Sequence, residues 1–533
     1  MYNNYTPLQQ RQLALQEYSN TQSTYLLVCA PARSTALKAT LTDQLHRKFR
    51  LVDRLGGELT ASVDGVLLAA EDVELMSTAL MYFAKALQDG ADYAVCNAVF
   101  GFGGATALYQ SQPLQAQNRC AVVSRTLLER CRAAAHDPEN VPELLALAAQ
   151  LCTRPALIPQ ALLHYERGIC AEDAFSAHGK RAFIMSHVLD MTGAPIVLVS
   201  AVPVLRSMGY EVLVLGPSDG GSLHLFLDAG ASVITRSSCR NVSDAWGMAL
   251  CADFVIVNTV VMARAVRALS GTAVPVLWWL HDAFAGYPHI AHQIPTQLGE
   301  NVRVYSVGSH AANAMHAVRP EFEIRPLIYG LPDYAAENFV RTDLGYNRGR
   351  PLFATVGSFE RRKGHDIFCK AIRLLPPEVR EKASFLFVGQ AADKEMMDSV
   401  RALTADYPEN VFYCKRLTRD EIKSLMEQCT GLVCASRDDP MPTFVTEGLI
   451  FGKPSIVSEH TGTAGLISEG RNGFVYHDDD PQQLAVLLEH AIEHPEELAS
   501  MRTECRKMYE QYYSKEAFEQ TLRAAVEDLT AKK

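Results

Sequence analysis

Residues 434–473 read CASRDDPMPTFVTEGLIFGKPSIVSEHTGTAGLISEGRNG, and this stretch carries more information about the fold than the rest of the chain. Seven residues separate Asp439 from Glu447, and a Pro-Met-Pro turn leads from Asp439 into the helix-forming segment TFVTEGLIFG. A turn that ends at a helix N-terminus directs free backbone N–H groups at one point, which favours an anion such as phosphate. Glu447 lies about one turn inside the helix, where a carboxylate can accept hydrogen bonds from sugar hydroxyls. The stretch therefore offers contacts for both halves of a nucleotide-sugar.

The sequence on either side alternates between strand and helix patterns, as in open α/β sheets. A first series of strand segments starts near Arg181 and reads AFIMS, EVLVLGP, SVITR, DFVIVNT, PVLWWLH and RVYSVGS. A second series reads LFATVGS, SFLFVGQ, VFYCKR, GLVCAS, SIVSE and GFVY. Such near-continuous apolar runs are typical of parallel strands that are buried on both faces. We expect the linker between the two series within residues 333–350.

A last helix is predicted near the C-terminus, because Phe518, Leu522, Ala525, Val526 and Leu529 form one apolar stripe. Asp480 and Pro481 predict the start of an earlier helix, as its N-cap and first residue.

Four distinctive residues directly follow predicted strands. Gly193 follows AFIMS at a short distance, His281 follows PVLWWL, Gly357 follows LFATV, and Asp439 follows GLVCAS. Open α/β sheets bind ligands at the carboxyl ends of their strands. We therefore expect these residues to line a cleft between two Rossmann-like units.

These blocks resemble the retaining GT-B glycosyltransferases of family 4, over roughly residues 180–510. In that family two acidic residues seven residues apart precede a small-residue helix, a Gly-x-Pro element and a strand. Here Asp439 and Glu447 precede Gly452-Lys453-Pro454 and SIVS. The segment FATVGSFERRKGHDIFCKA resembles the family's strand, glycine turn and Lys-Gly pair.

The resemblance implies an α/β fold of GT-B architecture, with two facing Rossmann-like domains and a smaller α/β domain before them. The expected domains are residues 1–175, then an acceptor-side Rossmann-like domain at 176–340 and a nucleotide-sugar donor domain at 341–510. Residues 511–533 are expected to form a helix that packs back on the first Rossmann-like domain.

The resemblance also implies the donor-site residues. Asp439 is expected to bind the transferred sugar together with backbone N–H groups near Thr443, Phe444 and Val445, and Glu447 to accept hydrogen bonds from ribose. Their alternative role is helix capping and solvation. Asp439 stands where the family has a longer Glu, and Asp438 before it leaves the register open by one residue.

The leaving diphosphate needs cations and N–H dipoles, because negative charge develops on it in the transition state. Lys363 and Arg362 are the candidates, since lysine offers a compact charge and arginine grips two oxygens. The alternative is a solvated loop. Many family members have arginine directly after the strand glycine, where this chain has Ser358, so Arg361 or Arg362 must compensate or phosphate binding is weaker.

His281 resembles the family's histidine near the sugar and the acceptor, with a structural histidine as the alternative. Asp282 beside it is expected to orient the ring or cap a helix. Gly193 and Gly357 suit backbone that approaches the diphosphate closely, although Gly193 also suits a plain turn. We expect the nucleoside base to meet Lys415, Arg416 and Leu417.

The N-terminal region is harder to interpret. GVLLAAEDVELMSTALMYFAKALQDGADYAVCNAVF weakly resembles the centre of family 2 GT-A glycosyltransferases, and residues 157–167 resemble a strand that ends such a domain. Ala69, Ala70 and Glu71, followed by Asp72, stand where that family has its metal-binding Asp-x-Asp. Because alanine cannot ligate a metal, we expect a degenerate domain for acceptor binding or self-association. An unrelated small α/β domain is the alternative.

Composition narrows the class of protein. The 533 residues are 48% hydrophobic, which excludes a disordered chain, and the net charge of -10 argues against nucleic acid as a partner. Thirteen scattered cysteines indicate neither a disulfide framework nor a zinc ribbon. The polar start MYNNYTPLQQRQ lacks a signal peptide's apolar core, so we expect a cytoplasmic location. The mixed basic and apolar residues 45–55 leave a peripheral contact with the inner face of the membrane open.

The resemblance therefore implies a metal-independent, retaining glycosyltransferase without a cofactor. It would move a sugar from a nucleotide-sugar to a glycan or lipid-linked acceptor in surface polysaccharide synthesis. One alternative is a non-catalytic GT-B-like scaffold, which Ser358, Asp439 and the degenerate first domain favour. A second is a sugar-nucleotide epimerase, which would need further acid/base groups in the cleft.

Overall fold

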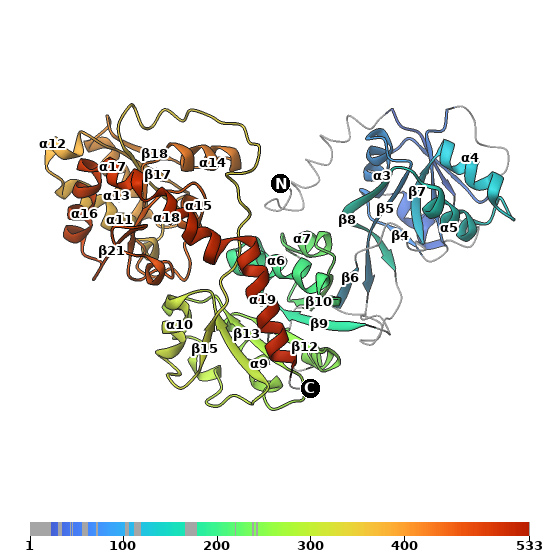
Figure 1. The fold of residues 1–533 in the computed structure, drawn as a ribbon. Coiled ribbons are helices and arrows are strands. Elements are labelled where there is room, and N and C mark those ends of the chain that lie inside the picture. The colour runs from blue at the N-terminus through green and yellow to red at the C-terminus, as the bar shows by residue number, and fades with distance from the viewer. Residues whose placement is uncertain are drawn as a thin grey trace. The chain divides into compact units, whose positions relative to one another are not determined.

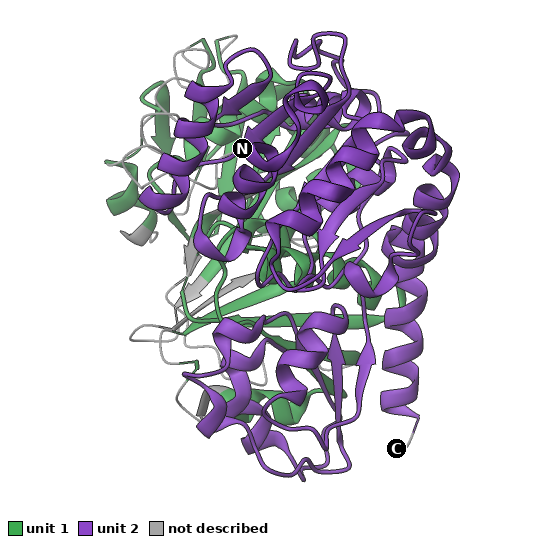
Figure 2. Ribbon diagram, turned by 90° about the vertical axis from the view of Figure 1, so that its left-hand side faces the viewer, with its two compact units in different colours: residues 1–256 green, residues 257–533 purple. Residues whose placement is uncertain are grey.

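The computed structural model describes residues 23–29, 35–42, 44, 46–55, 62–70, 73–101, 106–110, 119–165, 179–218, 220–236, 239–240 and 244–531. The start of the chain, Glu71, Asp72 and residues 166–167 lie outside this part, as do the expectations that rest on them. The chain forms two compact units, residues 1–256 and 257–533 (Figure 2). The four domains expected from the sequence divide the chain more finely and stay a prediction.

A six-stranded parallel sheet forms the centre of the C-terminal half of the second unit. Its strands are β16 (Leu352–Val356), β17 (Ser384–Val388), β18 (Val411–Cys414), β19 (Gly431–Cys434), β20 (Ser455–Ser458) and β21 (Gly473–Tyr476). The order across the sheet is β18-β17-β16-β19-β20-β21, so the sequence order reverses between β16 and β19. Side chains of β17, β19 and β20 are buried along their whole length, as the apolar sequence runs predict.

Helices accompany this sheet (Figure 1). They are α11 (His365–Leu374), α12 (Pro377–Arg380), α13 (Lys394–Asp406), α14 (Arg419–Gln428), α15 (Thr443–Ile450), α16 (Pro481–Glu493), α17 (Pro495–Ser500) and α18 (Arg502–Met508). Local sequence sets their starts: Asp480 caps α16, with Pro481 as its first residue, as predicted. Thr418 and Glu421 form a reciprocal capping box at α14.

The second unit also holds three parallel strands, β13 (Val276–Leu280), β14 (Val302–Ser306) and β15 (Ile324–Pro326), with helices α9 (Ala263–Leu269) and α10 (Ser309–His316). The last helix, α19 (Lys515–Thr530), follows a π-helical turn, Tyr509–Tyr513. Its buried residues are the five of the predicted stripe. Phe518 stacks on Trp279 of β13 with ring centroids 5.9 Å apart, so the end of the chain packs on a strand of the first predicted Rossmann-like domain.

The first unit is built on a mixed sheet. Its strands are β1 (Leu26–Cys29), β2 (Phe49–Val52), β3 (Gly65–Ala69), β4 (Glu74–Leu75), β5 (Tyr93–Gly101), β6 (Thr106–Gln110), β7 (Cys120–Ser124), β8 (Pro155–Tyr165), β9 (Lys180–Met185), β10 (Tyr210–Gly216), β11 (Ser232–Arg236) and β12 (Phe254–Asn258). Strands β9, β10 and β11 are parallel, and β11 pairs antiparallel with β6, which pairs with β5. Backbone hydrogen bonding is therefore continuous from the N-terminal strands into the Rossmann-like ones.

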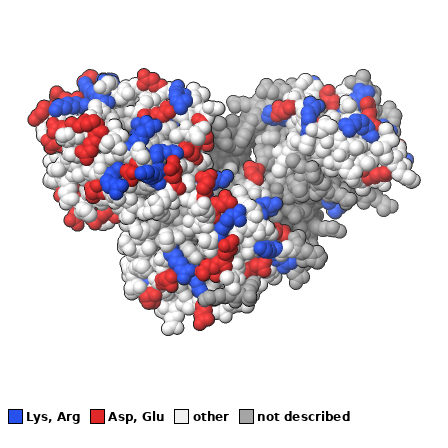
Figure 3. All heavy atoms as spheres, viewed as in Figure 1, with Lys and Arg blue, Asp and Glu red and all other residues white. Residues whose placement is uncertain are grey.

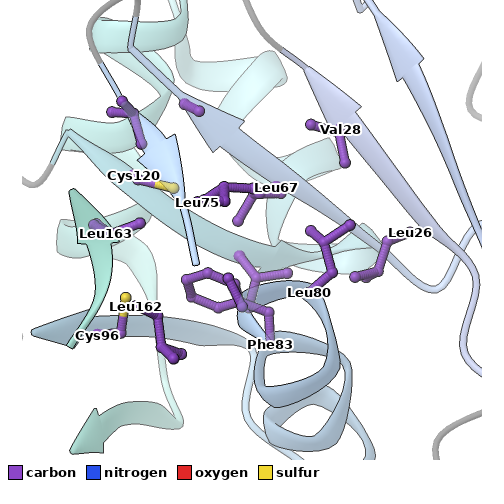
Figure 4. Close-up of a cluster of buried hydrophobic side chains, with 14 of the residues drawn as sticks. Leu26, Val28, Leu67, Leu75, Leu80, Phe83, Cys96, Cys120, Leu162 and Leu163 are labelled. Carbon is purple, nitrogen blue, oxygen red and sulfur yellow. The ribbon is translucent and has the colours of Figure 1, made fainter. Parts of the chain in front are cut away.

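Helices α2 (Thr35–Leu41), α3 (Ala79–Gln88), α4 (Arg125–Ala134), α5 (Val141–Leu151), α6 (Gly193–Ser207), α7 (Leu223–Asp228) and α8 (Asp244–Gly247) complete the first unit. The N-terminal strands bury apolar side chains on both faces of the sheet. Successive residues of one strand belong to two different clusters of buried hydrophobic side chains. Figure 4 shows one cluster, in which Leu80 and Phe83 of α3 pack with Leu26 and Leu67 from two strands. The N-terminal region thus has its own hydrophobic core, and its likeness to a GT-A domain stays a prediction.

Two further observations concern surfaces. In the described part of the chain, no helix has the length and apolarity needed to cross a membrane. Within residues 45–55, for which the sequence left a membrane contact open, residues 49–52 form strand β2, which pairs in parallel with β1. Acidic and basic side chains are interspersed over the face in Figure 3.

Candidate functional site

The reversal of strand order between β16 and β19 defines a site at the carboxyl edge of the six-stranded sheet. The loops that follow the two adjacent strands at such a reversal run in opposite directions. They leave a crevice between them, in which α/β sheets bind ligands. Gly357 directly follows β16, and the stretch quoted first begins at the last residue of β19. The expected base-contacting residues Lys415, Arg416 and Leu417 follow β18 at the same edge.

The Lys-Gly pair brings two of these connections together. Residues 361–363 form a short 3-10 turn that ends at Gly364, whose φ is 66°. A Cβ at Gly364 would collide with the carbonyl oxygen of Ala435, just beyond β19. A glycine is therefore required here for its positive φ and for close backbone approach. Nearby, Arg437 N–H donates to Arg362 O at 2.7 Å, which fixes the two loops to each other.

Lys363 and Asp439 form an ion pair across these loops. The Lys363 Nζ lies 2.6 Å from Asp439 Oδ2, and the lysine side chain is 20% exposed. Asp439 is buried, and its other oxygen accepts the Met441 N–H at 3.3 Å. The structure thus brings together two residues that the sequence analysis singled out separately. The pair places one cation and one acceptor at the strand-order reversal.

Glu447 lies on α15, whose N-terminus starts beyond Pro442. The Glu447 side chain is buried, and its Oε1 accepts a hydrogen bond from Arg419 Nη1 at 2.6 Å. Burial raises the pKa of Glu447, and the nearby arginine opposes that rise. Arg419 was not predicted from the sequence, because it lies 28 residues before Glu447, with β19 and the whole loop after it in between.

The first residues of α15 face Tyr329. The Tyr329 hydroxyl is 3.3 Å from Thr443 Oγ1 and 3.4 Å from Met441 O. Val445 N–H donates to Pro442 O at 3.1 Å, so that group is already used inside the first turn. Phe444 and Val445 are buried. Of the three predicted N–H contributors, Val445 therefore needs the largest rearrangement to reach a ligand.

Arg362 lies on the exposed side of the loop. Its Nη2 is 2.8 Å from Glu360 Oε1, which also accepts a hydrogen bond from Ser358 Oγ at 2.7 Å. The serine that replaces the family's arginine is thus linked to Arg362 through Glu360. This geometry makes Arg362 the nearer substitute of the two arginines considered. Arg361 is exposed, and its described contact uses the backbone carbonyl, which accepts a hydrogen bond from Arg437.

His281 directly follows β13 in the same unit. Its ring packs against Trp279 with centroids 4.7 Å apart. Asp282 Oδ2 accepts the Val260 N–H at 2.6 Å, and burial raises the pKa of Asp282 to about 6. The carboxylate therefore ties down the loop after β12.

Asp438 makes a contact that the sequence analysis did not foresee. Its two oxygens accept the backbone N–H groups of Phe284 at 3.0 Å and Ala285 at 2.8 Å, and His310 Nε2 is 2.7 Å from Oδ1. Burial disfavours the charged carboxylate, but these hydrogen bonds outweigh it and lower the pKa of Asp438. The two adjacent aspartates thus have separate partners: Asp438 holds the loop after His281, while Asp439 holds Lys363.

Gly193 lies in the other unit, as the first residue of α6. Around it, a Cβ would have open space within 4 Å, so close packing does not explain the glycine. Among the described residues, we find no group of three or more potential metal-ligating side chains.

Family comparisons identify two adjacent regions. Residues 178–321 match the family model described as glycosyl-transferase family 4, and residues 337–508 match the model described as glycosyl transferases group 1. Together the two models match more than half of the chain.

Two curated proteins are similar to parts of the chain. Spore coat protein SA of Bacillus subtilis is 27% identical over 160 residues, which are 28% of this chain and 41% of that protein. An uncharacterized glycosyltransferase of Methanocaldococcus jannaschii is 25% identical over 194 residues, which are 36% of this chain and 53% of that protein. The chain spans about half the length of the curated relatives it matches.

Solved structures share the fold at low sequence identity. Anabaena HepE in complex with UDP superposes with a TM-score of 0.53 and 18% identity, over 66% of this chain and 100% of that chain. Sucrose-phosphate synthase from Thermosynechococcus elongatus gives a TM-score of 0.52 and 15% identity, over the same shares.

Proposed function

From the premise that this chain belongs to the GT-B glycosyltransferases, through its family 4 and group 1 regions, we propose that it transfers a sugar from a nucleoside diphosphate sugar. The acceptor is a glycan or a lipid-linked glycan, and the anomeric configuration is retained. The role in surface polysaccharide synthesis, at the cytoplasmic side of the membrane, is part of the same proposal. The acceptor class and the pathway rest on the family alone.

The observation that carries the proposal is the pairing of Lys363 with Asp439 at the strand-order reversal, 2.6 Å apart. A ligand that carries both a diphosphate and hydroxyl groups suits this pair, because the ammonium group attracts phosphate oxygens and the carboxylate accepts hydrogen bonds from hydroxyls. In a site that only bound phosphate, a buried carboxylate beside the lysine would weaken binding.

The reaction breaks the bond between the anomeric carbon and a diphosphate oxygen, and the electron pair leaves with the diphosphate. The acceptor hydroxyl oxygen forms the new bond to the anomeric carbon, and its proton goes to the released diphosphate. Lys363 and Arg362 are placed to stabilise the charge that develops there, and the α15 N-terminus adds the positive end of its dipole. Asp439 releases its ion pair with the lysine to accept sugar hydroxyls. No metal ion is assigned a role, since the cations and the helix supply the positive charge.

Glu447 takes the nucleoside side of the donor. It is buried, lies on the helix that carries the diphosphate site, and keeps one carboxylate oxygen beyond its bond to Arg419. A nucleotide-sugar donor agrees with HepE, whose structures were determined with UDP and with UDP-glucose. His281 is assigned to the acceptor side, where it orients the attacking hydroxyl or bonds a donor hydroxyl.

Nucleotide binding is the first test. We expect one of UDP, GDP, TDP and ADP to raise the melting temperature of the wild-type protein. A ligand at about 100 times its Kd adds about 2.7 kcal/mol to the free energy of unfolding, which a melting curve resolves. The shift should disappear in Glu447→Ala and persist in Glu469→Ala, a control that removes an exposed glutamate from the connection after β20. No shift with any nucleotide would refute the proposal and favour the scaffold alternative.

Catalysis needs a separate test. With UDP-glucose and other nucleotide-sugars, we expect slow release of the nucleoside diphosphate that EDTA leaves unchanged. Proton NMR of a glycosylated product should give the donor's anomeric configuration. Conversion of one UDP-sugar into its epimer, without UDP release, would identify the epimerase alternative instead.

A further inference from the structure

Arg419 joins two parts of the donor site that the sequence does not connect. It is the first residue of α14, fixed there by the Thr418 capping box. Its guanidinium group lies over the Tyr334 ring at 4.3 Å while Nη1 bonds Glu447 at 2.6 Å. The Arg419 side chain is 53% exposed, but the Glu447 side chain that it bonds is only 8% exposed. Arg419 thus reaches from solvent to a buried acid.

Glu447 depends on this partner for its charge. Three titratable groups interact electrostatically with Glu447: Arg419 on α14, Tyr329 after β15 and Tyr334 in the linker. Of these, Arg419 is the cation. Without a cationic partner, the pKa of a buried carboxyl group is higher, so the group stays protonated up to a higher pH. A protonated acid offers one donor, whereas a carboxylate accepts on both oxygens, as a pair of vicinal hydroxyls requires.

We propose that Arg419 is a specificity-determining residue of the donor site, which holds Glu447 as an ionised acceptor and so selects nucleotides with an intact ribose diol. The inference rests on the proposed function, because it assigns the ribose to Glu447. Arg419 uses one acceptor site of Oε1, and a carboxylate has about four such sites, so both oxygens can still accept from the hydroxyls. A 2′-deoxyribose removes one donor, and the buried charge is then less well satisfied.

Tyr334 explains why an arginine suits this position. A planar guanidinium group can stack on an aromatic ring and still direct an N–H sideways to a carboxylate. A lysine carries the same charge without the stacked plane. We therefore expect Arg419→Lys to retain part of the selectivity and Arg419→Gln to lose it.

The test compares the binding of UDP and 2′-deoxy-UDP by calorimetry at pH 6.5 and pH 8.5. In the wild type we expect UDP to bind about tenfold more tightly than 2′-deoxy-UDP at both pH values. The deoxy form loses one hydrogen bond to a charged group, which accounts for a difference of that size. In Arg419→Gln the ratio should fall below about threefold at pH 6.5 and recover in part at pH 8.5. The ratio cancels the titration of the diphosphate itself. Arg401→Gln removes an exposed arginine of α13 and serves as the control.

A measurement without nucleotide separates this inference from the proposed function. A carboxylic acid whose pKa is higher in the folded than in the unfolded state loses stabilisation as the pH rises. The melting temperature of Arg419→Gln should therefore lie below that of the wild type, and the difference should increase from pH 5.5 to pH 8. When Glu447→Gln is added to Arg419→Gln, this increase with pH should disappear.

Three results would overturn the inference. Unchanged UDP selectivity in Arg419→Gln would show that Arg419 does not control the ribose. A pH-independent melting difference would show that Glu447 keeps its charge without it. Failure of every nucleotide to bind the wild type, with the pH-dependent melting intact, would refute the proposed function and leave a purely structural ion pair.

Discussion

At the scale of single residues, Lys363 is the group on which the proposed chemistry depends most. We expect Lys363→Ala to lower kcat for a nucleotide-sugar by about 10²–10³, because one preorganised charge at the leaving group is lost. Arg361→Ala is the matched control, since it removes an exposed cation two residues away. Rates of UDP release measure both variants. Equal rates in Lys363→Ala and the wild type would exclude the lysine from catalysis.

Asp438 supports a second prediction, on stability. Asp438→Ala removes the acceptor of two backbone N–H groups and of His310, so we expect a loss of about 2–3 kcal/mol in the free energy of unfolding at pH 7. Because the folded pKa of Asp438 lies below its ordinary value, its contribution is present above about pH 4 and is lost as the pH falls further. The difference between variant and wild type should therefore shrink in acid. Urea unfolding at pH 7, 4 and 3 measures it, and a difference that stays constant down to pH 3 would contradict the assignment.

Single residues also mark the limit of sequence-based prediction. Asp439, Lys363 and Glu447 are found from local motifs, and the structure places Lys363 and Asp439 in contact; their roles stay predictions. Arg419 and His310 could not be found in this way. The sequence separations of their bonds are 28 and 128 residues, and nothing local distinguishes them from surface residues.

At the scale of elements, Gly364 decides whether the 3-10 turn and β19 can meet. Gly364→Ala requires a positive φ in a residue with a side chain and a displacement of the Ala435 carbonyl. We expect a loss of about 2–3 kcal/mol in the free energy of unfolding and a much weaker nucleotide response, because Lys363 moves with the turn. Thermal melts with and without UDP measure both effects.

Gly470→Ala is the control for that substitution. Gly470 has a φ of 69°, yet a Cβ there meets open space. It should therefore lose only about 1 kcal/mol from backbone strain and keep its nucleotide response. Equal behaviour of the two variants would show that close approach to β19 is unimportant.

Elements are where prediction from sequence succeeded best. All twelve strand segments quoted from the two series contain strands, and the buried stripe of α19 is the predicted one. Apolar runs and helix caps are local signals in the sequence. The strands are recognised as apolar runs because both faces of a parallel sheet are buried. The strand at residues 49–52 was missed because a short mixed run of basic and apolar residues fits either period.

At the scale of the whole molecule, the GT-B assignment and the family are confirmed by the comparisons, while the N-terminal region shows what sequence patterns leave open. Its likeness to a degenerate GT-A domain stays a prediction and does not tell what the region does. The domain boundaries remain predictions for the same reason, because linkers carry weaker signals than strands.

The final helix provides a prediction at this scale. Phe518 and Trp279 are far apart in sequence and stack at 5.9 Å, and both are buried. We expect Phe518→Ala to cost about 3–5 kcal/mol, with Val486→Ala, 65% exposed on α16, as a nearly neutral control. Two of the three tryptophans lie on β13, so tryptophan fluorescence during urea unfolding reports on this packing. An unchanged midpoint would contradict a stabilising role for the last helix.

The pairing of β6 with β11 has a practical consequence for anyone who trims the chain. A shortened protein that begins near residue 179 would keep the two regions matched by the family models but would strip β11 of its antiparallel neighbour. The bare strand would then offer unpaired N–H and C=O groups to any other extended segment, which is the usual origin of edge-to-edge aggregation. Insolubility of such a fragment would thus reflect an uncovered β edge and would give no evidence that the N-terminal region takes part in sugar transfer.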